Sequence, residues 1–154
     1  MLPILIMIND SMEQIVAILK NKQPKLCVLS SATLSGVPES AVVGYAVKDD
    51  LTLVFSTQKN TRKYRMIMVN PHVSFVTGWS FHEPNIQIDG KARIVADKND
   101  IEYQDVEAFF FGQNQDAAKF KTDNTVFIIL KPTWYKLLDL SVHPVQEIEK
   151  TLSL

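Results

Sequence analysis

Four basic residues gather within a stretch of the chain that contains no acidic residue. Residues 51–82 include no Asp or Glu, and Lys59, Arg62, Lys63 and Arg65 give this stretch a charge of +4. The whole chain has a formal net charge of −1, so the remaining residues carry −5. A compact cationic patch on an acidic body favours a small anion over a nucleic acid, which needs many phosphate contacts.

The patch lies where an expected strand passes into an expected helix. A helix N-terminus carries partial positive charge and favours acidic residues, yet the first turn here holds Arg62 and Lys63. A bound anion would remove this conflict, because backbone N–H groups, two cations and the hydroxyls of Thr57 and Thr61 could converge on it. Each charge-assisted hydrogen bond would contribute roughly 1.5–3 kcal/mol. The spacing therefore predicts a phosphate site at this junction.

The elements around the patch are predicted to be mainly strands. Alternating apolar residues and turn residues indicate strands at residues 26–33, 39–48, 51–57, 72–77, 85–95, 126–130 and 134–140. Helical spacing indicates helices at residues 11–22, 61–69, 100–120 and 145–152, the second capped by Asn60 or Thr61. Gly90 indicates a bulge or tight bend in the fifth strand.

This order of elements favours one domain over residues 1–154. The first three strands are expected to form an antiparallel meander, and six or seven antiparallel strands favour a closed or partly closed barrel, because closure removes exposed edges. The five glycines form neither a GxGxxG motif nor a phosphate loop, which disfavours a parallel nucleotide-binding sheet.

Cysteine and histidine usage excludes other classes of site. Cys27 is the single cysteine and is interpreted as a small buried hydrophobe, and the three histidines stand in unrelated contexts. We therefore expect no disulfide and no metal site.

The start of the chain bears on its location. The longest apolar run, residues 2–8, is far shorter than the roughly 20 residues of a membrane helix. The chain also lacks the basic leader of a secretory signal. A cytoplasmic protein with neither membrane nor nucleic-acid partners is the resulting expectation.

Three motifs in sequence order carry a family resemblance. Residues 53–57 read Leu-Val-Phe-Ser-Thr, residues 61–63 read Thr-Arg-Lys, and residues 70–75 read Asn-Pro-His-Val-Ser-Phe. The segments at residues 28–32 and 36–38 look like a first hairpin. Together, from about residue 26 to residue 134, the chain resembles the pyridoxamine 5′-phosphate oxidase-like family of FMN-binding split barrels.

The resemblance implies a homodimeric, Greek-key-like split β-barrel with FMN at the subunit interface. It implies a phosphate-binding stretch made of Ser56, Thr57, Thr61, Arg62 and Lys63. It implies that the backbone of Ser40, Ala41, Val42 and Val43 runs along the flavin ring. Gln87 is similar to a glutamine that reaches the flavin from the partner subunit, and Trp134 is similar to a residue that flanks the ring.

The function implied is an FMN-binding oxidoreductase acting on a small molecule. FMN brings its own redox capacity, so no side-chain nucleophile is required and no catalytic residue is assigned. Residues 144–154 lack the basic, histidine-containing segment with which true pyridoxamine 5′-phosphate oxidases bind the substrate phosphate, so that activity is not expected. The alternatives are a non-catalytic flavin- or haem-binding or sensing protein, a deazaflavin-dependent reductase, and a structural dimer without a cofactor.

Overall fold

The computed structural model describes residues 2–152, and side chains from Ser11 onward. The strands are β1 (Leu26–Ala32), β2 (Pro38–Val47), β3 (Leu53–Gln58), β4 (His72–Thr77), β5 (Asn85–Val95), β6 (Thr125–Asp139) and β7 (Gln146–Thr151). The helices are α1 (Leu2–Asn21), α2 (Arg62–Val69) and α3 (Ile101–Gln113), followed by a 3-10 helix, η1 (Gln115–Phe120).

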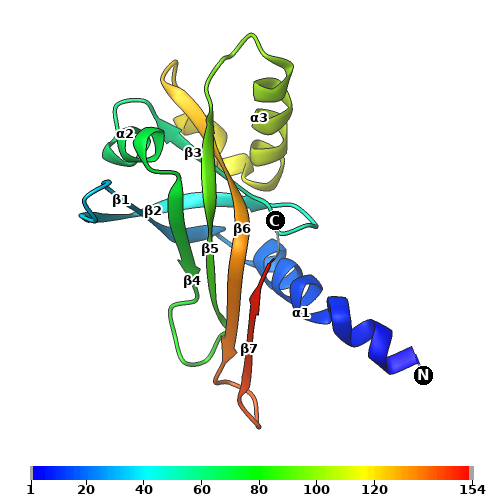
Figure 1. The fold of residues 1–154 in the computed structure, drawn as a ribbon. Coiled ribbons are helices and arrows are strands. Elements are labelled where there is room, and N and C mark those ends of the chain that lie inside the picture. The colour runs from blue at the N-terminus through cyan, green and yellow to red at the C-terminus, as the bar shows by residue number, and fades with distance from the viewer. Residues whose placement is uncertain (1, 153–154) are drawn as a thin grey trace.

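The strands pair in the order β3-β2-β1-β4-β5-β6-β7, and an additional pairing of β3 with β6 closes six of them into a barrel (Figure 1). β1, β2 and β3 form the expected antiparallel meander, and β4 returns through α2 to lie beside β1. This is a Greek key arrangement. The structure therefore confirms a mainly β, antiparallel split barrel, with β7 added at the edge of β6.

The barrel interior is filled by inward-facing side chains from every strand of the closed sheet. Tyr45, Phe55, Phe75 and Tyr135 are fully buried there, and the Tyr45 ring meets Phe75 edge to face at 5.4 Å. Cys27 is fully buried in the same core, which confirms its reading as a small hydrophobe. Its burial raises the pKa of the thiol far above the ordinary value and keeps it protonated.

Two helices add to this core from outside the barrel. α1 places Ile15 and Leu19 in the interior cluster, and the Tyr45 hydroxyl donates a 2.8 Å hydrogen bond to the Leu19 carbonyl. α3 packs Tyr103 and Phe110 against the outer surface of β2, β3 and β6, forming a second cluster. None of the described helices is long and apolar enough to cross a membrane.

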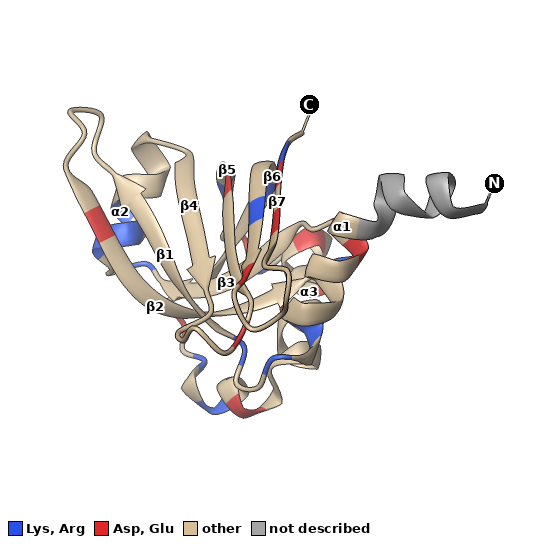
Figure 2. Ribbon diagram, turned by 90° about the horizontal axis from the view of Figure 1, so that it is seen from below, with Lys and Arg blue, Asp and Glu red and all other residues tan. Residues whose placement is uncertain are grey.

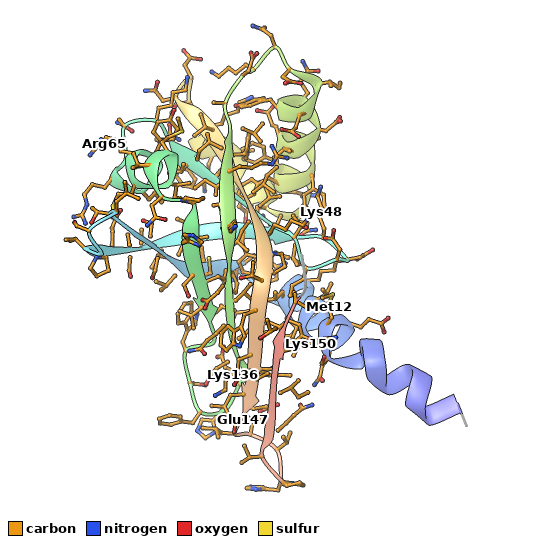
Figure 3. All side chains as sticks on the ribbon, viewed as in Figure 1. Met12, Lys48, Arg65, Lys136, Glu147 and Lys150 are labelled. Carbon is orange, nitrogen blue, oxygen red and sulfur yellow. The ribbon has the colours of Figure 1, made fainter. Side chains whose placement is uncertain are left out.

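The prediction of a helix at residues 145–152 is wrong, because this segment is strand β7. Pairing with β6 overrides the helical propensity of its Gln, Glu and Lys residues. Lys136 and Glu147 form a 2.9 Å ion pair across the two strands, and Trp134 Nε1 donates to Glu149 at 3.3 Å. Figure 3 shows Lys136 and Glu147 on the adjacent strands of this hairpin.

Three other boundaries differ from the prediction. The helix expected at residues 11–22 begins at Leu2, and the helix expected at residues 100–120 ends at Gln113, where Asn114 leaves helical geometry before η1. The two strands expected at residues 126–130 and 134–140 are the single strand β6. Pro132 is tolerated inside β6 because it faces the register shift at Gly90, the bulge that the sequence predicted.

Candidate functional site

The largest cleft opens where β2 and β3 separate. Their pairing covers only Tyr45–Val47 with Leu53–Phe55, after which β3 continues along β6 through Gln58. α3 and η1 form the opposite wall, and the cleft has a volume of about 1060 Å³. A hollow of this size is at the upper end of the range typical of small-molecule sites.

The edge of β2 in this cleft has backbone groups that β3 does not pair. The Tyr45 N–H donates to the Lys25 carbonyl on the β1 side, at 3.1 Å. Backbone groups of successive residues in a strand point to opposite edges, so the N–H and C=O of Val42 point toward the edge that β3 has left. This edge can donate to, and accept from, a planar ligand lying along β2.

One end of the cleft is built from the hydroxyls of Thr57 and Thr61. Thr61 caps α2, as predicted, and its hydroxyl accepts from the Tyr64 N–H at 3.3 Å. The same hydroxyl donates to the Gln58 carbonyl at 2.8 Å, so Thr57 is the donor in its 3.1 Å contact with Thr61. Turning the Thr57 hydroxyl toward an anion would cost only that one contact. The free N–H groups of the first turn of α2 lie beside it.

Lys63 supplies a cation at this end of the cleft. Its side chain is half-buried and lines the cleft, and desolvation lowers its pKa, an effect that the nearby Glu39 carboxylate partly opposes. A bound anion would compensate for this desolvation. Lys63 and the two threonine hydroxyls therefore make one end of the cleft suitable for a phosphate group.

The rest of the basic patch lies outside the cleft. Arg62 is mainly exposed, and its Nε is 3.9 Å from Glu39 Oε2. Figure 2 shows the basic residues of α2 beside the acidic position near the start of β2. Arg65 lies on the outer side of α2, where it donates to the Asn60 carbonyl (Figure 3). Arg62 can reach a ligand only at the mouth of the cleft.

The predicted site residues fall into two groups. Six line the cleft: Val42, Val43, Ser56, Thr57, Thr61 and Lys63. Five do not: Ser40, Ala41, Arg62, Gln87 and Trp134. Ser40 is on the outer face of β2, where its hydroxyl lies 2.8 Å from that of Ser30, and Ala41 is its neighbour in the strand.

Gln87 and Trp134 lie on the outer face of β5 and β6. Gln87 pairs in register with Lys136, and both line a separate hollow of about 280 Å³. Trp134 is two residues from Lys136 and is half-buried on the same face. Neither residue lines the main cleft of its own chain, so a role at that site requires a second subunit.

The sequence reasoning did not identify the α3–η1 wall or the turn before β1. These contribute Lys20, Lys25, Phe110, Phe111, Asn114 and Lys119 to the cleft. Asn114 is fixed there because its Nδ2 donates to the Tyr45 carbonyl at 2.8 Å. No local motif marks these residues, since the return of the chain through β6 is what brings them opposite β2.

Gln58 joins the two sides of the cleft. Its Nε2 donates to Thr125 Oγ1 at 3.0 Å, and its Oε1 accepts from Thr122 Oγ1 at 2.6 Å. These contacts connect the end of β3 to the segment that follows η1. The phosphate-type end of the cleft is thus coupled directly to its far wall.

The described residues contain no group of three or more His, Cys, Asp or Glu side chains placed to hold a metal ion. In the part of the chain that the structure describes, the cleft lining also contains no His, Met, Cys or Tyr. The chemistry of the lining is that of lysines, hydroxyls, amides and phenylalanines.

Comparison with known proteins identifies relatives of this chain. A curated relative, the pyridoxine/pyridoxamine 5′-phosphate oxidase of Ehrlichia ruminantium (strain Welgevonden), is 32% identical over 88 residues. The match covers 56% of this chain and 45% of the relative, so the chain spans less than half the length of that protein.

Solved structures share the fold. A haem-binding protein from Mycobacterium smegmatis superposes with a TM-score of 0.72 at 14% identity, over 92% of this chain and 57% of the other. A pyridoxamine 5′-phosphate oxidase-related, FMN-binding protein from Nostoc punctiforme PCC 73102 superposes with a TM-score of 0.65 at 13% identity, over 92% and 94%. At these identities the likeness shows the fold alone.

The family model described as pyridoxamine 5′-phosphate oxidase matches residues 11–139, which is most of the chain. The match includes every strand of the closed barrel and both threonines of the cleft. The chain therefore belongs to the pyridoxamine 5′-phosphate oxidase family.

Proposed function

We propose that the cleft binds FMN and that the protein is an FMN-dependent oxidoreductase of a small molecule. The observation that carries this proposal is the combination of half-buried Lys63 and two threonine hydroxyls at one end of the cleft with an unpaired edge of β2 beside them. Family membership and the FMN-binding relative from Nostoc punctiforme support the choice of FMN.

The lining residues fit the parts of FMN. Lys63, Thr57 and Thr61 would hold the phosphate, and the backbone of Val42 would lie along the ring edge. Phe111 provides an apolar wall. FMN, when bound, supplies the transfer of hydride or electrons, so the protein's own task is to bind, orient and partly desolvate the ring.

The proposed active form is a homodimer. Figure 1 shows that no described helix lies in front of β4, β5 and β6. Val42, Val28, Val76 and Gln87 are successive register partners across this sheet. Their outer face continues directly into the cleft, because Val42 belongs to both and is 67% exposed. Burial of this face by a second copy would bring Gln87 and Trp134 toward the partner's cleft.

Haem is the main competing ligand, because a structural neighbour is a haem-binding protein. Haem iron takes a His, Met, Cys or Tyr ligand, and none of these residue types is present in the described cleft lining. FMN is therefore the better fit. A deazaflavin with a similar phosphate would use the same lysine and hydroxyls.

The test is a titration of the purified protein with FMN, followed by flavin fluorescence, with riboflavin as the matched ligand that lacks the phosphate. We expect saturable binding of FMN and binding of riboflavin at least about tenfold weaker, the loss of one charge-assisted phosphate contact. Equal affinities would contradict the phosphate site. Failure to bind FMN, with binding of haem or a deazaflavin, would replace the proposed cofactor.

A further inference from the structure

The main cleft has more positive charge than a flavin phosphate needs. Its charged lining residues are Lys20, Lys25, Lys63, Lys119, Lys121 and Asp116, which is five cations and one anion. The whole chain, by contrast, has a net charge of −1. Only Lys63 adjoins the two threonine hydroxyls, so the cationic lining extends well beyond the proposed phosphate site.

Three of the remaining four lysines are accounted for by contacts within the chain. Lys20 pairs with Asp49, and Lys121 pairs with Glu107 at 2.5 Å. Lys119 is exposed to solvent, with its ammonium 5.2 Å from the centre of the Phe120 ring. These lysines therefore do not require an external anion.

Lys25 differs from all of them. Only 6% of its surface is exposed, and no described side chain forms an ion pair or hydrogen bond with its ammonium. The side-chain atoms that are fully enclosed and lack a hydrogen bond are oxygens of Glu39 and Glu107, so the Lys25 ammonium keeps access to solvent. The cleft is the hollow that Lys25 lines. A buried cation that opens only into a cleft and has no counter-charge favours an anionic ligand.

Lys25 also lies at the opposite end of the cleft from Lys63. It precedes β1, and its carbonyl accepts the Tyr45 N–H beside Gly44. Asn114 of the far wall approaches the same place, because its Oδ1 lies 4.0 Å from where a Cβ on Gly44 would stand. The segment after η1 reaches the other end, at Gln58. The cleft therefore has two cationic ends separated by the β2 edge.

We propose that Lys25 binds the anionic group of a second small molecule, a carboxylate or phosphate, that shares the cleft with the cofactor. This inference rests on the proposed function and narrows it, because it assigns the substrate to the class of small organic acids or phosphate esters. The acid group would lie at the Lys25 end, which orients the rest of the molecule toward the β2 edge. Lys25 is thus a substrate-binding residue and takes no part in holding the cofactor phosphate.

The test uses three probes of similar shape: benzoate, phenyl phosphate and the uncharged benzamide. Each is titrated by calorimetry into the protein with and without FMN. We expect the charged probes to bind at least about tenfold more tightly than benzamide. The ratio of benzoate to phenyl phosphate affinity then distinguishes a carboxylate site from a phosphate site. Equal affinities for all three probes would overturn the proposal.

Two variants link the site to Lys25. In Lys25→Met the preference for charged probes should be lost, while Lys25→Arg should keep it. Lys22→Met is the matched control, because Lys22 lies in the same turn, pairs with Glu83 at 2.8 Å and does not line the cleft. The control should bind the probes as the unchanged protein does. Retained charge preference in Lys25→Met would overturn the assignment.

The FMN titration separates this inference from the proposed function. Lys25→Met should bind FMN with unchanged affinity, since Lys63 and the threonines remain. If the unchanged protein binds FMN but its charge preference does not depend on Lys25, only the substrate inference fails. If FMN does not bind at all, the proposed function fails, and the titrations without FMN decide whether Lys25 is an anion site.

Discussion

Replacement of Lys63 by methionine should weaken FMN binding strongly while the protein stays folded. The change keeps the length of the side chain and removes one charge at the phosphate end of the cleft. A charge-assisted hydrogen bond contributes about 1.5–3 kcal/mol, and a factor of ten in Kd corresponds to about 1.4 kcal/mol. The expected rise in Kd is therefore about 10- to 150-fold.

Two features of the structure place the effect in the upper part of this range. Lys63 is half-buried, so water screens its interaction with a phosphate less than it would at the surface. Glu39 lies near Lys63, and one of its oxygens is enclosed without a hydrogen bond. Without the lysine charge, this carboxylate would repel the phosphate.

The assay is a fluorescence titration with FMN, and Lys59→Met is the matched control. Lys59 belongs to the same basic patch and carries the same charge, but it is exposed and does not line the cleft. Exposed charge interactions contribute about 0.2–1 kcal/mol, so the control should weaken binding no more than about fivefold. Equal effects of the two substitutions would refute the reasoning, since diffuse charge and not a built site would then attract the ligand.

Three further outcomes are expected. Because desolvation lowers the pKa of Lys63 and only its protonated form attracts a phosphate, FMN affinity should fall at a lower alkaline pH than an ordinary lysine titrates, and Lys63→Arg should abolish this fall; a pH-independent Kd would count against it. Gly90→Ala should lower the free energy of unfolding in urea by about 1–3 kcal/mol, because its Cβ would stand 2.3 Å from the Lys131 carbonyl oxygen, whereas Gly112→Ala, with open space around it, should not destabilise the protein. Chains with Gln87→Ala and chains with Lys63→Met, unfolded together and refolded as mixed dimers, should regain some high-affinity FMN sites that neither variant has alone; no recovery would contradict a shared site.

Local patterns in the sequence predicted much of the fold. The strands at residues 72–77 and 85–95 have the expected bounds, and Thr61 caps its helix, because alternation and capping depend on neighbours close in the chain. The segment at residues 145–152 was wrong for the complementary reason. Its residues favour a helix locally, and only pairing with β6 makes it a strand.

The candidate site divides in the same way. Thr57, Thr61 and Lys63 are within seven residues of one another, so the sequence alone could place them together at a strand–helix junction. Lys25, Phe110 and Asn114 come from distant parts of the chain and carry no motif. They meet only because α3 packs against β2 and β6 returns beside β3.

The sequence by itself therefore determined the antiparallel strands, the capped helix and the phosphate-type end of the cleft, since each depends on interactions a few residues apart. The tertiary structure decided how deep the cleft is, which lysine opens into it without a counter-charge, and on which face Gln87 lies. Those properties depend on barrel closure, where contacts between residues far apart in sequence fix burial and charge environment.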